Sequence, residues 1–224
     1  MLEAVIFDMD GVLVDTEPLH YEVDREYIAE QGFELDLEFY SQFIGSTNTH
    51  LWTCVKERYG LTQSIEEMNL ATEEKIRKRV QESGYPEMPG AKELVRRLKT
   101  AGLKLAVASS SRMSQIERVI AQMDLNDCFD KLVSGESVSH PKPAPDVFLK
   151  AAKLLGTAPE KCLVIEDSTN GSRAAKAAGM ACLGFINPSF LPSDLSAADY
   201  LCEGHEGVDA HFLEMVHARS FGEP

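Results

Sequence analysis

The sequence predicts an α/β protein, a doubly wound parallel sheet with a helical domain inserted after its first strand. From about residue 91 onward, apolar runs alternate with helical segments, a pattern typical of right-handed βαβ units. Between the first apolar run and residue 83, apolar residues recur at helical spacing instead. We therefore expect an α/β core of residues 1–15 and 84–224, and a helical insertion of residues 16–83.

Each element follows from its own pattern. Val5, Ile6 and Phe7 form the kind of apolar run that parallel strands show when both faces are buried. Residues 18–81 read as helical, with Leu19 and Val23 on one face, and glycine and proline at residues 84–90 end this stretch. After it we predict helices at about residues 91–101, 113–123, 145–155 and 171–178, alternating with strands at 103–108, 132–133, 162–165, 181–186 and 200–201.

The composition bounds the function. The 224 residues include 22 basic and 36 acidic side chains, a formal net charge of −14, which argues against nucleic acid or an anionic membrane as partner. No apolar run is long enough to span a bilayer, and the N-terminus lacks the basic segment of a signal peptide. The five scattered cysteines are typical of reduced core thiols. We expect a cytoplasmic monomer that acts on a small molecule.

The first strand is followed by two carboxylates. Asp8 and Asp10 are two residues apart, so an extended chain presents both on one side at the strand's carboxyl end. Open parallel sheets place their ligand crevice there. Carboxylates held this close repel, so the pair needs a cation or a shared proton. For these two residues alone, an ordinary turn rich in Asp and Gly is an equal alternative.

Polar side chains also follow the later strands. Taken singly, the serines could cap the next helix, the lysine could be a solvated loop residue, and the acids could complement a helix dipole. All of them, however, fall at the same predicted edge of the sheet, where carboxylates suit Mg²⁺ and hydroxyl and ammonium groups suit phosphate. These residues are Ser109, Ser110, Ser111, Lys142, Glu166 and Asp167.

The four motifs together resemble the haloacid dehalogenase superfamily over nearly the whole chain. The first motif is matched by Asp8-Met9-Asp10-Gly11, the second by the strand that ends at Ser109, and the third by Lys142-Pro143-Ala144-Pro145. Glu166-Asp167 is similar to the fourth. The resemblance is to the helical-cap subgroup, which implies a Rossmann-like core with residues 16–83 as a cap domain.

The resemblance also implies a chemistry, phosphate-ester hydrolysis through an aspartyl-phosphate. Asp8 would attack phosphorus, and Asp10 would protonate the leaving oxygen and then activate water. Superfamily dehalogenases need no metal and lack the second aspartate, so Asp10 favours phosphoryl transfer. The implied phosphate-binding residues are Ser109, Ser110 and Lys142, and the implied Mg²⁺ ligands are Asp8, the Asp10 carbonyl and Asp167, with Glu166 in support.

Within the superfamily the chain resembles the group of β-phosphoglucomutase and related sugar-phosphate phosphatases. Thr16, His20 and Asn48 are the cap residues expected to contact substrate. His20 matches the mutase's cap histidine, but Asp24 stands where the mutase has tryptophan. Residues 45–48 match a segment in which the mutase carries a phosphate-gripping arginine, and Asn48 cannot supply that charge.

These departures favour a Mg²⁺-dependent phosphatase acting on a small phosphorylated metabolite such as a hexose phosphate. A mutase must hold a bisphosphate at both ends, whereas a phosphatase needs to hold only one phosphate. A phosphotransferase that interconverts sugar 1- and 6-phosphates is the alternative. The third hypothesis is a binding protein of the same fold without catalytic activity, and the presence of both Asp8 and Asp10 argues against it.

Overall fold

The chain folds into two compact units. The computed structural model describes residues 1–43, 48–188 and 193–222. The core unit comprises Met1–Asp15 and Pro86–Pro224, and the helical unit comprises Thr16–Tyr85. The two units are described in turn.

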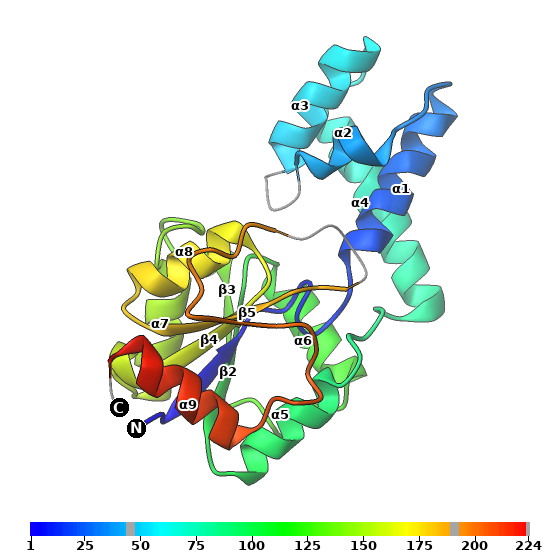
Figure 1. The fold of residues 1–224 in the computed structure, drawn as a ribbon. Coiled ribbons are helices and arrows are strands. Elements are labelled where there is room, and N and C mark those ends of the chain that lie inside the picture. The colour runs from blue at the N-terminus through cyan, green and yellow to red at the C-terminus, as the bar shows by residue number, and fades with distance from the viewer. Residues whose placement is uncertain (44–47, 189–192, 223–224) are drawn as a thin grey trace. The chain divides into compact units, whose positions relative to one another are not determined.

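The core unit is built on a parallel sheet. Within the described residues it has six strands in the order β3-β2-β1-β4-β5-β6 (Figure 1). β1 lies in the middle, with Phe7 opposite Val107 of β2 on one side and Ile165 of β4 on the other. The strand order therefore reverses beside β1, where open sheets form their ligand crevice. The strands are β1 (Ala4–Phe7), β2 (Lys104–Ser109), β3 (Lys131–Ser134), β4 (Cys162–Glu166), β5 (Ala181–Phe185) and β6 (Tyr200–Cys202).

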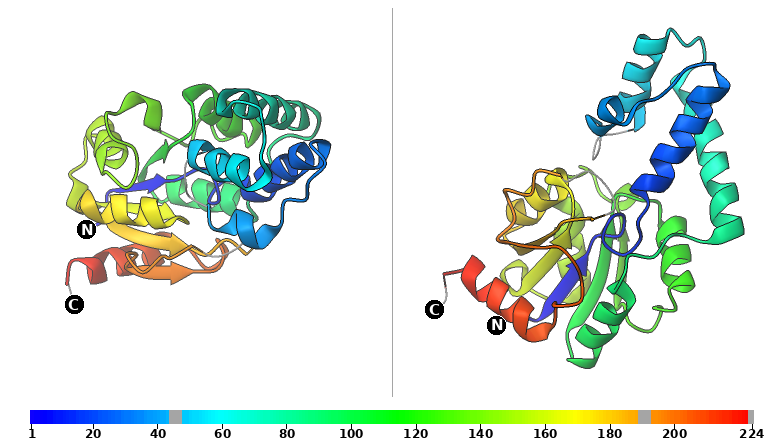
Figure 2. Two further views of the ribbon diagram at one scale, coloured as in Figure 1. Left: turned by 90° about the horizontal axis from the view of Figure 1, so that it is seen from above. Right: turned by 45° about the vertical axis from the view of Figure 1, so that its right-hand side comes forward.

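Helices cover both faces of this sheet (Figures 1 and 2). Alternate strand residues such as Ile6 and Val164 pack against α7 (Asp146–Leu155) and α8 (Thr169–Ala177). The other face contacts α5, α6 and α9, so both faces of the central strands are buried and read as apolar throughout. The bounds of these three helices are Ala91–Thr100, Met113–Gln122 and Ala210–Ser220, and short 3₁₀ turns occupy Gly135–Ser137 (η1) and Pro159–Lys161 (η2).

The helical unit holds its own apolar core. Trp52 is 1% exposed and packs edge-on against Tyr27, at 5.5 Å between ring centroids. Ser64 starts the longest of its helices with a capping box, in which Glu67 N donates to the serine hydroxyl and the Glu67 side chain accepts from Ser64 N. The helices are α1 (Glu17–Glu30), α2 (Leu37–Ser41), α3 (Asn48–Tyr59) and α4 (Ile65–Ser83).

One carboxyl group is buried inside the helical unit. Asp24 of α1 is 6% exposed and accepts a 3.2 Å hydrogen bond from the hydroxyl of Tyr40 on α2. Burial raises the pKa of Asp24 to about 7, although the bond from Tyr40 opposes this shift. The position that distinguishes this chain from the mutase pattern is therefore an internal link between two helices.

The two chain segments that border the helical unit lie side by side in the core unit. Asp15 N donates to the carbonyl of Pro86 at 2.7 Å, and Met88 N donates to the carbonyl of Leu13 at 2.9 Å. Val14 and Glu87 form an antiparallel bridge between these two bonds. The chain thus leaves and re-enters the core at one hydrogen-bonded point.

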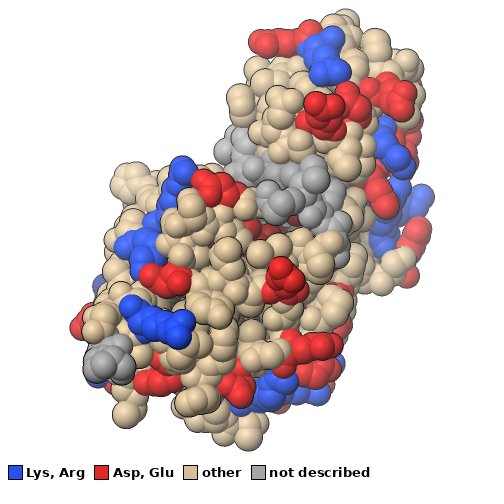
Figure 3. Space-filling view, in the orientation of Figure 1, with Lys and Arg blue, Asp and Glu red and all other residues tan. Residues whose placement is uncertain are grey.

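The predicted fold class is confirmed. The strand expected at 103–108 is Lys104–Ser109, and the helices expected at 91–101 and 113–123 end one residue earlier. The helix expected at 171–178 starts at Thr169, because the Ser168 side chain caps it by accepting from Gly171 N. In the described part of the chain no helix is long and apolar enough to cross a membrane. Figure 3 shows acidic and basic side chains interspersed on the visible face, with no broad basic surface among the described residues there.

Candidate active site

The site is built around the carboxyl end of the central strand. Asp8 follows β1 directly, and its N–H donates to the carbonyl of Ile165 at 2.9 Å, which extends the pairing with β4 by one residue. Asp8 is buried, with its side chain 9% exposed. Its direction is therefore fixed by the sheet.

A buried lysine faces Asp8. Lys142 lies in the loop before α7, and its Nζ donates to Asp8 Oδ1 at 2.6 Å and to Glu166 Oε1 at 2.8 Å. The ammonium also lies over the ring of Phe148, 4.7 Å from its centroid. Burial by itself lowers the pKa of Lys142, but the two carboxylates outweigh it and hold the pKa above its usual range. Lys142 is thus a permanent positive charge at the strand ends.

Asp8 lies close to other acidic side chains at this edge of the sheet. Burial raises the pKa of Asp8 to about 7, with Lys142 opposing the shift and the nearby Glu166 and Asp10 adding to it. The Lys142 ammonium pairs with Asp8 and with Glu166, and Asp10 and Asp167 follow β1 and β4 at the same edge of the sheet. Further positive charge would allow Asp8 to ionise fully near neutral pH.

Hydroxyl groups hold the second aspartate. Asp10 Oδ2 accepts hydrogen bonds from Ser111 Oγ at 2.7 Å and from Ser109 Oγ at 3.3 Å. Ser109 ends β2 and accepts in turn from the N–H of Ser111 at 3.0 Å. Ser110 lies between them and is exposed. The structure thus joins Ser109 to Asp10, and the phosphate-binding roles expected of Ser109 and Ser110 stay predictions.

Two glycines make room for the acidic pair. Gly11 has φ +80°, and a Cβ there would lie 1.9 Å from Asp167 Oδ2. A Cβ at Gly171 would lie 1.6 Å from Glu166 Oε1. Glu166 is 1% exposed, and its other oxygen accepts from Ser168 N at 2.6 Å. Each carboxylate therefore lies directly against the backbone of a glycine. A larger residue at either glycine would push the carboxylate out of its position.

The donor set fits Mg²⁺. Among the described residues no three Asp, Glu, His or Cys side chains converge into a ready-made cage. Mg²⁺ does not require one, because proteins usually bind it through one or two carboxylates together with water and substrate phosphate. Asp8 and Asp167 are carboxylate oxygen donors that directly follow β1 and β4, at the carboxyl ends of these central strands. Glu166 accepts hydrogen bonds from Lys142 Nζ and Ser168 N, and its support for the metal stays a prediction.

The residues predicted to read the substrate lie in the helical unit. Thr16 is 1% exposed and precedes α1, His20 is half-buried on α1, and Asn48 is exposed as the first residue of α3. Residues 45–47 of the segment matched to the mutase lie outside the described residues. The roles of Thr16, His20 and Asn48 stay predictions.

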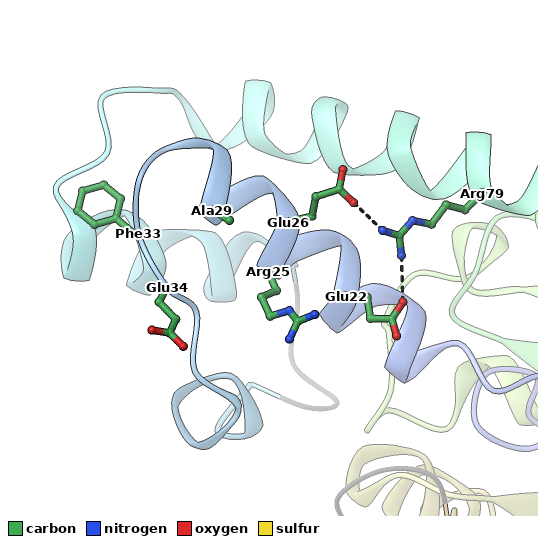
Figure 4. A pocket seen from close by; sticks show the side chains of 7 residues that line it. All are labelled: Glu22, Arg25, Glu26, Ala29, Phe33, Glu34 and Arg79. Atoms are coloured by element: carbon green, nitrogen blue, oxygen red, sulfur yellow. Dashed lines mark hydrogen bonds and ion pairs between the residues drawn. The ribbon is translucent and has the colours of Figure 1, made fainter.

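A pocket of about 520 Å³ also lies in the helical unit (Figure 4). Arg79 of α4 is paired there with Glu22 and Glu26 of α1, which neutralises one end of the basic run 75–79. The lining has three carboxylates and two guanidinium groups, a poor environment for a phosphate dianion. The lining residues are Glu22, Arg25, Glu26, Ala29, Phe33, Glu34 and Arg79.

Comparison with known proteins agrees with this arrangement. Residues 5–185 match the family described as haloacid dehalogenase-like hydrolase. The chain belongs to this family. It is 35% identical over 179 residues to the phosphorylated carbohydrates phosphatase of Thermotoga maritima, which covers 80% of this chain and 82% of that protein. It is 34% identical to hexitol phosphatase B of Escherichia coli over 184 residues, 79% of this chain and 80% of that protein.

A solved structure shows the same fold. The D10N mutant of CbbY from Rhodobacter sphaeroides, in complex with xylulose-1,5-bisphosphate, superposes with a TM-score of 0.78 at 28% identity. The match covers 94% of this chain and 98% of that one. This haloacid dehalogenase-like hydrolase therefore shares both its core and its helical insertion with a protein whose structure holds a phosphorylated sugar.

Two contacts at the site were not predicted. Ser111 makes the shorter bond to Asp10, and the sequence signal for it was its place two residues after the last strand residue, Ser109. Phe148, the ring under Lys142, lies in a helix whose apolar pattern predicts only packing. Such a ring contact depends on the tertiary fold and has no local signal.

Proposed function

We propose that this hydrolase is a Mg²⁺-dependent phosphatase of a small phosphorylated metabolite, a sugar phosphate in particular, working through an aspartyl-phosphate. The observation that carries the proposal is the pairing of Asp8 with Lys142 at 2.6 Å at the end of the central strand. A carboxylate oxygen held there can attack phosphorus, and an ammonium beside it can balance the charge of the phosphoryl oxygens.

In this proposal Asp8, Lys142 and Asp10 have separate roles in the reaction. Asp8 forms the bond to phosphorus while Lys142, itself held by Glu166, stays beside the transferred group. Asp10, oriented by the hydroxyls of Ser109 and Ser111, delivers a proton to the leaving oxygen and later removes one from water. Hydrolysis of the acyl phosphate then restores Asp8.

A bound Mg²⁺ would offset the charge of the acids and of the substrate's phosphate, so that the phosphate can approach Asp8. Asp8, Asp167 and the Asp10 carbonyl are the groups proposed to hold it. We also propose that the helical unit acts as the substrate-reading cap, with Thr16, His20 and Asn48 as contacts. A carbohydrate phosphate is favoured because two relatives act on such compounds by name.

The test is phosphate release from p-nitrophenyl phosphate and a panel of sugar monophosphates, with Mg²⁺ and after chelation. We expect turnover only with the metal, and loss of turnover in Asp8→Asn with the thermal unfolding temperature unchanged or raised. Asp130→Asn is the matched control, because Asp130 also pairs with a lysine, at 2.7 Å from Lys99 Nζ, but lies at the opposite end of β2. Substantial activity in Asp8→Asn would contradict the proposed mechanism.

The second candidate is a phosphotransferase that interconverts sugar 1- and 6-phosphates. His20 favours it, because this half-buried residue of α1 matches the cap histidine of the mutase. Asn48 favours the phosphatase. The wild-type enzyme, primed with glucose 1,6-bisphosphate, should release phosphate from sugar monophosphates faster than it isomerises glucose 1-phosphate. Isomerisation that outruns hydrolysis would make the mutase the better proposal.

A further inference from the structure

One buried histidine contacts the turn that carries Asp10. His205 lies between β6 and α9, is 1% exposed, and its Nε2 is 2.8 Å from the carbonyl oxygen of Val12. A carbonyl only accepts, so Nε2 carries the proton and Nδ1 does not. Nδ1 is buried and has no hydrogen-bond partner among the described residues. Burial also lowers the pKa of His205, so the imidazole is the neutral donor.

The ring is fixed from several sides. It stacks on Phe185, the last residue of β5, with centroids 4.3 Å apart and an interplanar angle of 13°. Gly90 lies against it, since a Cβ there would be 3.2 Å from His205 Cβ. The guanidinium of Arg97 donates to the backbone carbonyls of His205 at 3.0 Å and Val208 at 2.8 Å. The donor nitrogen is therefore held in place by the core.

The turn that His205 contacts is held together by its own backbone hydrogen bonds. The carbonyl of Met9 accepts from the N–H groups of Val12, Leu13 and Val14, and Gly11 N donates to the carbonyl of Val14 at 2.7 Å. Residues 9–14 are thus tied to one another, and the bond from His205 joins them to the segment between β6 and α9. A shift of the Val12 carbonyl would move Asp10 within the same turn.

We propose that His205 is a positioning residue for the reaction, setting Asp10 through the Val12 carbonyl. The inference rests on the proposed phosphatase function. An apolar side chain would fill this space without burying an unpaired ring nitrogen, whose desolvation is unfavourable. What the histidine adds is the Nε2 hydrogen bond, and its only acceptor in the described structure is the turn of the catalytic motif.

A second histidine provides a matched control. His217 of α9 is 3% exposed, its Nε2 is 2.8 Å from the carbonyl of Glu160, and its Nδ1 is also buried without a partner among the described residues. Glu160 belongs to η2, which precedes β4 at the opposite edge of the sheet. His205→Phe and His217→Phe thus remove similar bonds, and only the first acts on the turn. His205→Gln restores a donor.

The experiment compares kcat and KM of these variants on p-nitrophenyl phosphate and on an alkyl phosphate. His205→Phe should lower kcat on the alkyl phosphate about 10- to 100-fold, as expected for a displaced catalytic group, with KM little changed and a smaller loss on the better leaving group. His205→Gln should recover most of this, and His217→Phe should stay near the wild-type rate. Equal losses in the two phenylalanine variants, or none in His205→Phe, would overturn the proposal.

Amide hydrogen exchange of residues 11–14 in the substrate-free protein gives a readout that does not depend on activity. Exchange should accelerate in His205→Phe and stay unchanged in His217→Phe. If the wild type releases no phosphate from any substrate, the proposed function fails. Hydrogen exchange alone then tests whether His205 holds the turn through the Val12 carbonyl. Unchanged exchange in His205→Phe would then overturn it, and faster exchange confined to this variant would support it.

Discussion

The buried carboxyl of Asp24 should make the helical unit less stable as pH rises. The pKa of Asp24 is 3.8 in an unfolded chain and about 7 here. Between these values the native state keeps a proton that the unfolded state loses, so the free energy of unfolding falls with rising pH across this window. At 1.4 kcal/mol for each pH unit, the loss is about 4 kcal/mol once the pH exceeds 7.

The substitution that isolates this effect is Asp24→Asn. The amide oxygen can still accept the hydrogen bond from Tyr40, but the side chain no longer titrates. We expect the variant to match the wild type within about 1 kcal/mol at about pH 4 and to exceed it by about 2–4 kcal/mol at about pH 8. The stabilisation at high pH is the signature, because most substitutions of buried residues destabilise.

Urea unfolding at a series of pH values provides the measurement. Trp52 is the only tryptophan of the chain and is buried in the same helical unit, so its fluorescence follows this unit. Glu57→Gln, an exposed acid on α3, is the control and should leave the pH dependence as it is in the wild type. If the wild type and Asp24→Asn give parallel curves over the whole range, Asp24 is not protonated in the native state and the reasoning is wrong.

Three other predictions concern the active site and the cap. Asp10→Asn should lower the rate of hydrolysis of an alkyl phosphate by about 10²–10⁴-fold and that of p-nitrophenyl phosphate by less, because a good leaving group needs little protonation. Equal losses in the rate of phosphoenzyme formation from the two substrates would refute the role of Asp10 as the acid. Gly171→Ala should lower the free energy of unfolding by about 1–3 kcal/mol and reduce turnover, because its methyl group would displace the Glu166 carboxylate that holds Lys142. Gly204→Ala, which has open space, is its control in denaturant unfolding and activity assays, and equal behaviour would argue against the contact. Asn48→Arg should raise the affinity for a bisphosphorylated sugar about 10- to 100-fold more than the affinity for a monophosphate, as measured by calorimetric titration, because one new charge-assisted bond becomes available. An equal gain for both ligands would contradict the assignment of residue 48 to the second phosphate.

The fold was predictable because local pattern and tertiary burial coincide in this chain. The strands beside β1 are buried on both faces, so Leu163-Val164-Ile165 is apolar at every position and is recognised without an alignment. The start of one helix was missed by two residues. The start of α8 depends on the Ser168 cap, a hydrogen bond that the apolar periodicity does not encode.

The candidate site was predictable in its members and less so in its contacts. The position of Asp8, Ser109 and Glu166 at strand ends follows from the parallel topology alone. That Lys142 reaches both Asp8 and Glu166 depends on the conformation of the loop before α7, and the link from His205 joins residues 193 positions apart. Contacts of that kind arise from packing, and no short-range pattern in the sequence reports them.

The hydrogen-bonded junction of residues 13–15 with 86–88 bears on how this protein can change. Because Asp15 N and the Pro86 carbonyl are only 2.7 Å apart, a short turn can reconnect the chain there without a change in either segment. The residues of the sheet and of the catalytic edge all lie in the core unit, so this joint is a place where an insert can be exchanged as a cassette. If the helical unit reads the substrate, as proposed above, selection for a new substrate can remodel this unit while the groups of the core unit keep their positions. The same joint is a suitable splice point for laboratory chimaeras built from caps of related hydrolases.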